Sequence, residues 1–415
     1  MRETVTYTSE IAEALAPDVL ERFLRYVRID TQSDRAHRQS PSTPGQLELA
    51  RLLVRELREI GLEDAALDTN GFVTATLPGN VRDAPAVGLL AHVDTTPDES
   101  GAGVEPLVHR GYDGGTIELP RRGTVLDPER MPELTPKAGH DIVTSSGDTL
   151  LGADDKAGVA EVMAAVAYLA AHPELPRATL RVGFTPDEEI GKGAFLFDIE
   201  GFGAECAYTF DGSEVGELTD ETFSAASAEL TIHGVEVHPG MATGKLVNAA
   251  RLAGRVLAAL PQDRLTPEST SEREGFIHVH HVNATPGVAK IEAIVRDFDD
   301  DRLAEHVGLL RRTAEQVVAT EEQYPNMRRF LDHHPRVSAA AEEAIRREGL
   351  EPRRVPIRGG TDGSILSARG LPTPNIFTGG HEYHSVREWA SVQDMASASA
   401  VAVRLAGVWA ERQSG

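Results

Sequence analysis

Cysteine is almost absent from this chain, because Cys206 is the only one among 415 residues. A single cysteine cannot form an internal disulfide, which favours a reducing compartment. Long apolar runs are also missing: the longest, residues 162–171, is about half of a membrane-spanning helix. Residues 1–3 lead into polar sequence without an apolar signal core. We therefore expect a cytoplasmic protein with no membrane partner.

Basic residues are in the minority. The chain has 41 Lys and Arg against 65 Asp and Glu, so its formal net charge is −24. An acidic surface repels phosphate backbones, which argues against nucleic acid as a partner. The length exceeds that of one ordinary hydrophobic core and predicts two domains.

The first half of the chain alternates helix and strand signals. A helix is expected from Pro44 to Ile60, ended by Gly61, and another from about Lys156 to Ala171. Strands are expected at 72–77, 86–93, 180–185 and 206–210, whereas residues 97–146 have many Gly and Pro and little periodicity. This alternation predicts an α/β domain whose sheet is mostly parallel, with helices on both faces.

The pattern changes between about Leu218 and Tyr324. It predicts a strand near 230–232, a helix at 246–260, strands at 276–282 and 289–298, and a helix at 301–319. This β-α-β-β-α order indicates a smaller, ferredoxin-like α+β domain at 218–326, inserted in a larger domain formed by 1–217 and 327–415. The larger domain resumes with a helix at 335–347, strands at 355–357 and 375–377, and a closing helix at 394–412.

Four clusters of histidine or acidic residues stand where strands of the first half end, and a fifth residue lies in a late loop. They are His92 with Asp94, Asp154 with Asp155, Glu188 with Glu189, Asp211, and His384. The carboxyl ends of parallel strands are where open α/β sheets bind ligands. Each cluster alone has an ordinary explanation, such as a helix N-cap at Asp154. Together, histidine and carboxylate without cysteine predict a hydrolytic metal site.

Seven short motifs span nearly the whole chain. They are His-Val-Asp-Thr at 92–95, Leu-Leu-Gly-Ala-Asp-Asp-Lys-Ala-Gly at 150–158, Phe-Thr-Pro-Asp-Glu-Glu-Ile-Gly at 184–191, Thr-Phe-Asp-Gly at 209–212, Val-His-Pro-Gly at 237–240, Ile-Arg-Gly-Gly-Thr-Asp-Gly at 357–363 and Phe-Thr-Gly-Gly at 377–380. This set resembles the peptidase T family of aminotripeptidases, within the larger group of dinuclear zinc peptidases and deacylases. The last two motifs separate peptidase T from the deacylases best.

The resemblance implies two Zn²⁺ ions per chain, with Mn²⁺ or Co²⁺ as alternatives. The implied ligands are His92 and Asp211 on one metal, Glu189 and His384 on the other, and Asp154 as the bridge. Asp94 would orient His92 through its second ring nitrogen. Glu188 would be the general base, taking a proton from the attacking water and passing it to the leaving amine. The Asp154–Asp155 peptide is expected to be cis.

The inserted domain is expected, from the same resemblance, to act as a lid that contacts the substrate. His238 would approach the scissile carbonyl, while Asn248 and Arg358 would face the far end of the substrate. A guanidinium pairs well with a carboxylate, so Arg358 could hold the C-terminus of a tripeptide. The alternative is a solvated arginine beside Arg353 and Arg354.

One departure from the family pattern concerns the end of this inserted domain. The family normally has a further strand after the second helix of the lid. Here the predicted helix ending near Ala319 runs almost directly into residues 322–327. Either the sheet lacks an edge strand, or residues 317–321 form a very short one.

The leading hypothesis is a cytoplasmic dinuclear zinc aminopeptidase that releases the N-terminal residue of tripeptides. A dipeptidase, a carboxypeptidase and an N-acyl amino acid deacylase remain open on the same scaffold, as does a non-catalytic peptide-binding homologue. The expected partners are small peptides, and a homodimer is left open. A zincin helix is excluded, because His381 and His384 are three residues apart instead of four.

Overall fold

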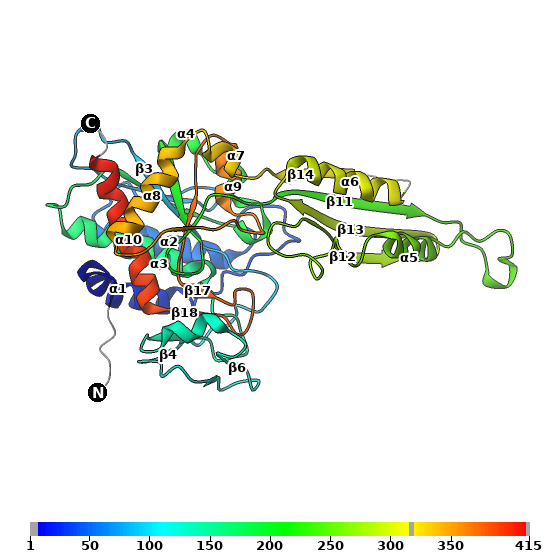
Figure 1. The fold of residues 1–415 in the computed structure, drawn as a ribbon, viewed down its shortest axis with the longest axis horizontal. Helices are drawn as coiled ribbons and strands as arrows, with labels where there is room; N and C mark the ends of the chain where they lie inside the picture. The colour runs from blue at the N-terminus through cyan, green and yellow to red at the C-terminus, as the bar shows by residue number, and fades with distance from the viewer. Residues whose placement is uncertain (1–6, 315–318, 412–415) are drawn as a thin grey trace. The chain divides into compact units, whose positions relative to one another are not determined.

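The computed structural model describes residues 7–314 and 319–411, which divide into two compact units (Figure 1). The first unit consists of the chain up to Asp220, residues 329–355, and residues from Thr361 onward. The second consists of 221–328 and 356–360, so the short segment around Arg358 groups with it.

An eight-stranded sheet forms the centre of the first unit, as far as the structure describes it. Its order is β1 (Ala66–Leu67), β2 (Val73–Leu77), β8 (Leu180–Thr185), β3 (Val87–His92), β9 (Cys206–Phe210), β16 (Asn375–Ile376), β10 (Glu217–Thr219) and β15 (Arg353–Arg354). The four central strands, from β8 to β16, are parallel. This confirms the predicted α/β class, although β15 precedes the strand expected at 355–357.

Helices cover both faces of this sheet. One core joins it to α1 (Glu10–Tyr26), α2 (Pro44–Ile60), α3 (Ala153–Ala171), α8 (Pro335–Arg347) and α10 (Val392–Glu411). On the opposite face, Phe202 of α4 (Ile199–Phe202) lies against Gly88 and Gly183, and a Cβ at Gly88 would come within 2.7 Å of its ring. Two short helices, α7 (Arg328–Leu331) and α9 (Asp362–Ala368), follow later in the chain. None of these helices is long and apolar enough to cross a membrane.

The segment expected to be irregular, residues 97–146, contains two of the four strands of a second, small sheet. The strand order is β17 (Gly380–His381), β18 (Trp389–Ser391), β7 (Ile142–Thr144) and β4 (Leu107–His109). A hairpin of β5 (Ile117–Glu118) and β6 (Val125–Leu126) and the turn η1 (Pro132–Lys137) share a core with Trp389. These strands are too short for periodicity to reveal them.

The second unit is an antiparallel sheet with two helices. Its strand order is β12 (Phe276–Ala284), β13 (Val288–Asp297), β11 (Ser224–His233) and β14 (Ala319–Tyr324), with α5 (Ala249–Ala259) and α6 (Asp300–Ala314) packed on it. The elements follow the predicted β-α-β-β-α order, and of the two alternatives left open for its end, a missing edge strand or a very short one, the structure has a strand, β14. The second helix is described as far as Ala314 and does not include Ala319, which begins β14, an edge strand paired with β11. Its polar sequence, as is common at sheet edges, gave no apolar alternation.

Candidate metal centre

The candidate site lies where three parallel strands of the first unit end. His92 is the last residue of β3 and is in register with Thr185 at the end of β8. Asp211 directly follows β9, and Glu188 and Glu189 lie in the turn η2 (Glu188–Ile190) after β8. At the start of α3, the Asp154–Asp155 peptide is cis, as expected.

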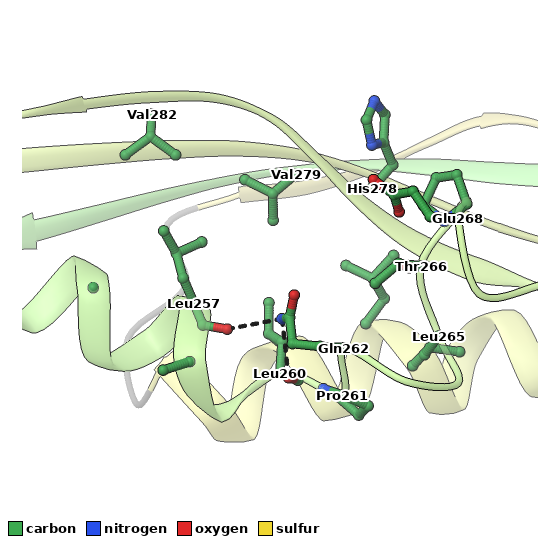
Figure 2. A pocket seen from close by; sticks show the side chains of 14 residues that line it. Leu257, Leu260, Pro261, Gln262, Leu265, Thr266, Glu268, His278, Val279 and Val282 are labelled. Carbon is green, nitrogen blue, oxygen red and sulfur yellow. Dashed lines mark hydrogen bonds between the residues drawn. The ribbon is translucent and has the colours of Figure 1, made fainter.

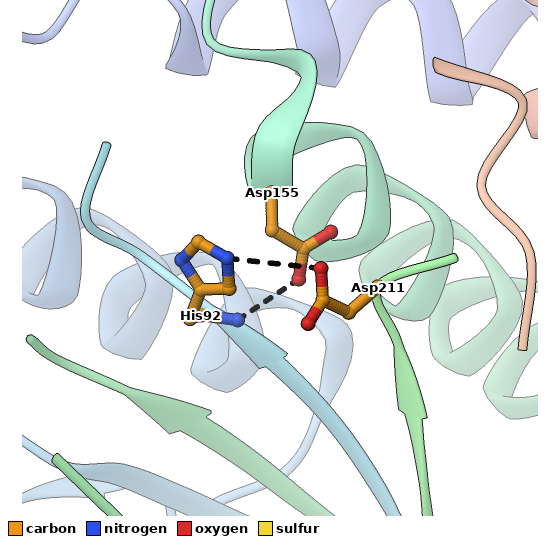
Figure 3. A group of neighbouring side chains, drawn as sticks. All are labelled: His92, Asp155 and Asp211. Atoms are coloured by element: carbon orange, nitrogen blue, oxygen red, sulfur yellow. Dashed lines mark hydrogen bonds and ion pairs between the residues drawn. The ribbon is translucent and has the colours of Figure 1, made fainter. Parts of the chain in front are cut away.

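The five predicted ligands come together in two groups, in which Asp155, not itself a predicted ligand, takes a place beside His92 and Asp211. Each group has three potential ligand atoms within 4.8 Å of one another: His92, Asp155 and Asp211 in the first, and Asp154, Glu189 and His384 in the second. Figure 3 shows the first group, with the His92 ring and the two carboxylates turned toward one another. The late loop brings in His384, which adopts a positive φ of 59°.

Asp154 connects the two groups. Its Oδ1 lies 2.9 Å from Nε2 of His92, and its Oδ2 lies 3.3 Å from Nε2 of His384. The neighbouring Asp155 is committed to the backbone, because its oxygens accept from the N–H of His92 at 3.0 Å and of Gly158 at 3.3 Å. Asp154 is thus the carboxylate with one oxygen facing each imidazole.

Asp94 contacts both the histidine and the pair of glutamates. Nδ1 of His92 lies 3.0 Å from the backbone oxygen of Asp94 and 3.5 Å from its Oδ1. The same carboxylate accepts hydrogen bonds from the backbone N–H of Glu188 at 2.9 Å and of Glu189 at 3.1 Å. Because Asp94 is fully buried, it fixes the η2 turn relative to His92.

The protein's own groups leave this site with an excess of buried negative charge. Burial raises the pKa of Glu188 and Asp211 well above their usual values, and raises that of Glu189 to about 7. Burial also opposes ionisation of Asp154, but hydrogen bonds from His384 and His92 outweigh it and hold its pKa below the usual value. Such crowding is relieved by cations.

The donor set fits divalent metal ions. Each group combines an imidazole with two carboxylates, a mixture that suits Zn²⁺, Mn²⁺ or Co²⁺. Oε1 of Glu189 is buried and has no hydrogen-bond partner in the described chain, whereas its Oε2 lies 3.0 Å from Nε2 of His384. A buried acceptor without a donor is an expected feature of a ligand position.

Sequence reasoning missed supporting residues around these groups. Asp362 accepts a hydrogen bond from Oγ1 of Thr185 at 2.6 Å, and burial raises its pKa to about 6. Asp187, with a positive φ of 58°, is fully buried and accepts from Ser42 and Gln46. Both lie inside motifs noted above, so a motif-by-motif reading of every polar residue could have found them.

The three predicted substrate contacts belong to the second unit and make local contacts there. Nδ1 of His238 accepts from the N–H of Gly240 at 3.2 Å, and Oδ1 of Asn248 caps α5 by accepting from Arg251 at 3.1 Å. The Arg358 guanidinium donates hydrogen bonds to Oγ1 and the backbone oxygen of Thr270 and to the backbone oxygen of Glu274. Its guanidinium is therefore already engaged.

A separate pocket of about 670 Å³ opens in the second unit between α5 and β12 (Figure 2). Apolar side chains such as Leu257, Leu265 and Val279 form much of its wall. Glu268 and His278 are the ionisable side chains among the fourteen residues that line it. This pocket offers too few ligand-type groups for a metal centre.

Comparison with known proteins decides the family. The model of peptidase family M20/M25/M40 matches residues 149–407, which is more than half of the chain. The chain belongs to this peptidase family. It is therefore a metal-dependent peptidase, and its two groups of candidate ligands lie partly within the matched residues.

Relatives of this M20 peptidase match along nearly its whole length. Peptidase T of Bacillus velezensis is 46% identical over 407 residues, which cover 95% of this chain and 99% of the relative. Peptidase T of Aliivibrio fischeri is 47% identical over 402 residues, with 94% and 98% covered. The peptidase T resemblance seen in the sequence motifs is confirmed.

Solved structures share the fold. The aminopeptidase PepT of Bacillus cereus matches with a TM-score of 0.73 and 22% identity, covering 95% of this chain and 99% of that one. A tripeptidase of Staphylococcus aureus matches with a TM-score of 0.74 and 20% identity, covering 95% and 98%. Both structures thus share the overall fold of this chain over nearly its whole length.

Proposed function

We propose that this peptidase is a dinuclear zinc aminopeptidase that hydrolyses the N-terminal peptide bond of tripeptides. The observation that carries the proposal is the position of Asp154, whose two oxygens face His92 and His384 of the two ligand groups. Relatives named Peptidase T, at 46–47% identity over nearly the full length, support the substrate class.

The proposed ligands are those expected from the sequence. They are His92 and Asp211 for one metal ion, Glu189 and His384 for the other, and Asp154 for both. We prefer Asp154 to Asp155 as the bridge, because backbone N–H groups already occupy the oxygens of Asp155. When bound, two divalent ions would polarise the scissile carbonyl and activate the attacking water.

Glu188 is proposed to move the proton. Its Oε2 lies 4.0 Å from Nε2 of His92, so the carboxylate reaches the first ligand group. Its backbone N–H is held by Asp94 at 2.9 Å, which fixes the turn that presents the side chain. Glu188 would accept a proton from the attacking water and deliver it to the leaving amine.

Substrate length requires a second fixed point besides the metal site. Arg358 stays the prediction for this role, as do His238 for the scissile carbonyl and Asn248 for the far end of the substrate. If Arg358 binds the C-terminal carboxylate, the N-terminal bond of a tripeptide lies about two extended residues, or roughly 7 Å, away. Since the guanidinium already donates to Thr270 and Glu274, a substrate carboxylate would have to share or replace these bonds.

A peptide panel tests the proposal. Di-, tri- and tetrapeptides, each with a free and an N-acetylated amino terminus, are assayed with added Zn²⁺. We expect free tripeptides to be cleaved at the first bond, and the other peptides to be cleaved much more slowly. Preferred cleavage of acetylated substrates would instead favour the deacylase alternative, and release of the C-terminal residue would favour a carboxypeptidase. The cytoplasmic location, which the single cysteine favours, and a homodimer also remain predictions.

A further inference from the structure

Glu388 is a buried carboxylate that the proposed mechanism does not use. It is 1% exposed and lies just before β18, at the end of the loop that carries His384. In the sequence, Glu388 lies outside the seven motifs and has no acidic residue next to it. Its place in the structure nevertheless connects two segments that are more than two hundred residues apart.

The carboxylate of Glu388 accepts three backbone hydrogen bonds from the loop that leads into α3. Oε2 accepts from the N–H of Leu151 and of Gly152, each at 2.8 Å, and Oε1 accepts from the N–H of Asp154 at 3.0 Å. Three backbone N–H groups thus converge on the two oxygens of one buried carboxyl group. The third of these bonds holds the backbone of the residue whose side chain faces both ligand groups.

The small sheet makes Glu388 a rigid anchor. Trp389, the next residue, is in register with Thr144 of β7 and with His381 of β17. The loop between β17 and β18 is also closed on itself, because the N–H of Glu388 donates to Ser385 at 3.2 Å. The same small sheet therefore supports the loop of His384 and, through β7, the chain that leads to Leu151.

Tyr383 provides a second connection from this loop to the ligand segments. Its hydroxyl donates to the backbone oxygen of Gly212 at 2.8 Å, next to the candidate ligand Asp211. The loop is thus tied to the segment after β9 near one end and to the segment before α3 at the other. His384 lies between these two attachment points.

We propose that Glu388 is a positioning residue that holds the backbone of Asp154 so that its carboxylate can serve both metal ions. This role rests on the proposed metal site. Residues that orient metal ligands typically contribute about 10–100-fold to metal affinity. The expected consequence of losing Glu388 is weaker binding at both positions, because Asp154 faces both.

The test measures metal binding to Glu388→Gln directly. A glutamine keeps the size of the side chain but replaces one accepting oxygen with an NH₂ group. Because both oxygens of Glu388 accept backbone hydrogen bonds, this NH₂ group would face at least one backbone N–H, and that hydrogen bond would be lost. Zn²⁺ affinity is measured by competition with a chelator, and the environment of bound Co²⁺ by its visible absorption. We expect the Zn²⁺ affinity of both metal positions to fall by about 10–100-fold and the Co²⁺ absorption bands to change. Glu388→Asp, which retains the carboxyl group but is one methylene shorter, should change the metal affinity and the Co²⁺ bands in the same direction.

Glu348→Gln is the matched control. Glu348 is also fully buried, and accepts hydrogen bonds from Thr8 and Arg404. Its variant should lower the unfolding temperature without changing metal affinity or the Co²⁺ spectrum. Such a result in the control separates a general loss of stability from a specific effect on Asp154.

The possible outcomes have distinct meanings. Unchanged affinities and spectra in folded Glu388→Gln and Glu388→Asp, with wild type binding two metals, would overturn the role of Glu388 alone. Weakening confined to the His384 position would also overturn it, because the effect would not pass through Asp154. A wild-type protein that binds no Co²⁺ would overturn both this role and the proposed metal site.

Discussion

Replacing Glu188 with glutamine separates proton transfer from metal binding. The substitution preserves side-chain size and leaves the backbone hydrogen bond to Asp94, at 2.9 Å, in place. It removes a carboxylate whose Oε2 is 4.0 Å from Nε2 of His92, so a proton acceptor is lost at the first ligand group. General-base catalysis contributes about 10²–10⁴-fold, which corresponds to roughly 3–5 kcal/mol of activation free energy.

The assay combines turnover with metal analysis. The kcat of Glu188→Gln on trialanine should fall by about 10²–10⁴-fold, while its metal content equals that of wild type. The matched control is Glu189→Gln, whose native carboxylate lies 3.0 Å from Nε2 of His384 and which should lose metal as well as activity. Near-normal turnover in Glu188→Gln would refute the general-base assignment.

Two further predictions address specificity and pH. Arg358→Ala should lower kcat/KM for free tripeptides, raising the activation free energy by about 2–5 kcal/mol, and should narrow their advantage over C-terminally amidated tripeptides. An equal loss on both substrates would instead indicate that Arg358 only holds the segment around Thr270. Burial lowers the pKa of His381, stacked on Trp389, from 6.5 to about 4. As the pH falls, the unfolded chain protonates this histidine before the folded protein does, so the free energy of unfolding decreases. Between pH 7.5 and 5 it should decrease by about 2 kcal/mol more in the metal-free protein than in metal-free His381→Gln, measured by urea unfolding. Equal decreases would contradict the lowered pKa.

The elements with strong periodicity could be predicted from the sequence. The helix Pro44–Ile60 has proline at its start and Gly61, with a φ of 106°, at its end, and the structure gives the predicted boundaries. In contrast, α1 was not anticipated, although Ala12, Leu15 and Val19 form a buried stripe on it. A proline inside this helix, Pro17, conceals the pattern.

Weak local signals explain the other differences. The strand β14 belongs to a polar stretch at a sheet edge, so its pairing with β11 depends on tertiary structure that no short window encodes. The strands β7 and β18 have three residues each, and they pair with each other across a long separation in sequence. Residues 315–318, which include part of the short strand considered at 317–321, lie outside the described residues.

The candidate site also combines features that local sequence predicts with contacts that it does not predict. Four of the five predicted ligands were predictable because each lies within a short motif, and His384 lies in a late loop a few residues after the motif at 377–380. The contacts that hold them were not, because they join distant segments: Glu388 contacts Asp154, and Asp187 contacts Ser42. A single acidic residue in a loop gives no indication of which backbone groups it will accept from.

Metal stoichiometry in two variants tests the central claim most directly. If Asp154 is shared by two metal ions, Asp154→Ala should retain neither metal tightly, whereas His384→Ala should retain one, compared with about two per chain in wild type. The measurement is elemental analysis after dialysis against a weak chelator, with folding checked by circular dichroism. Equal metal content in wild type and both variants would contradict the shared site.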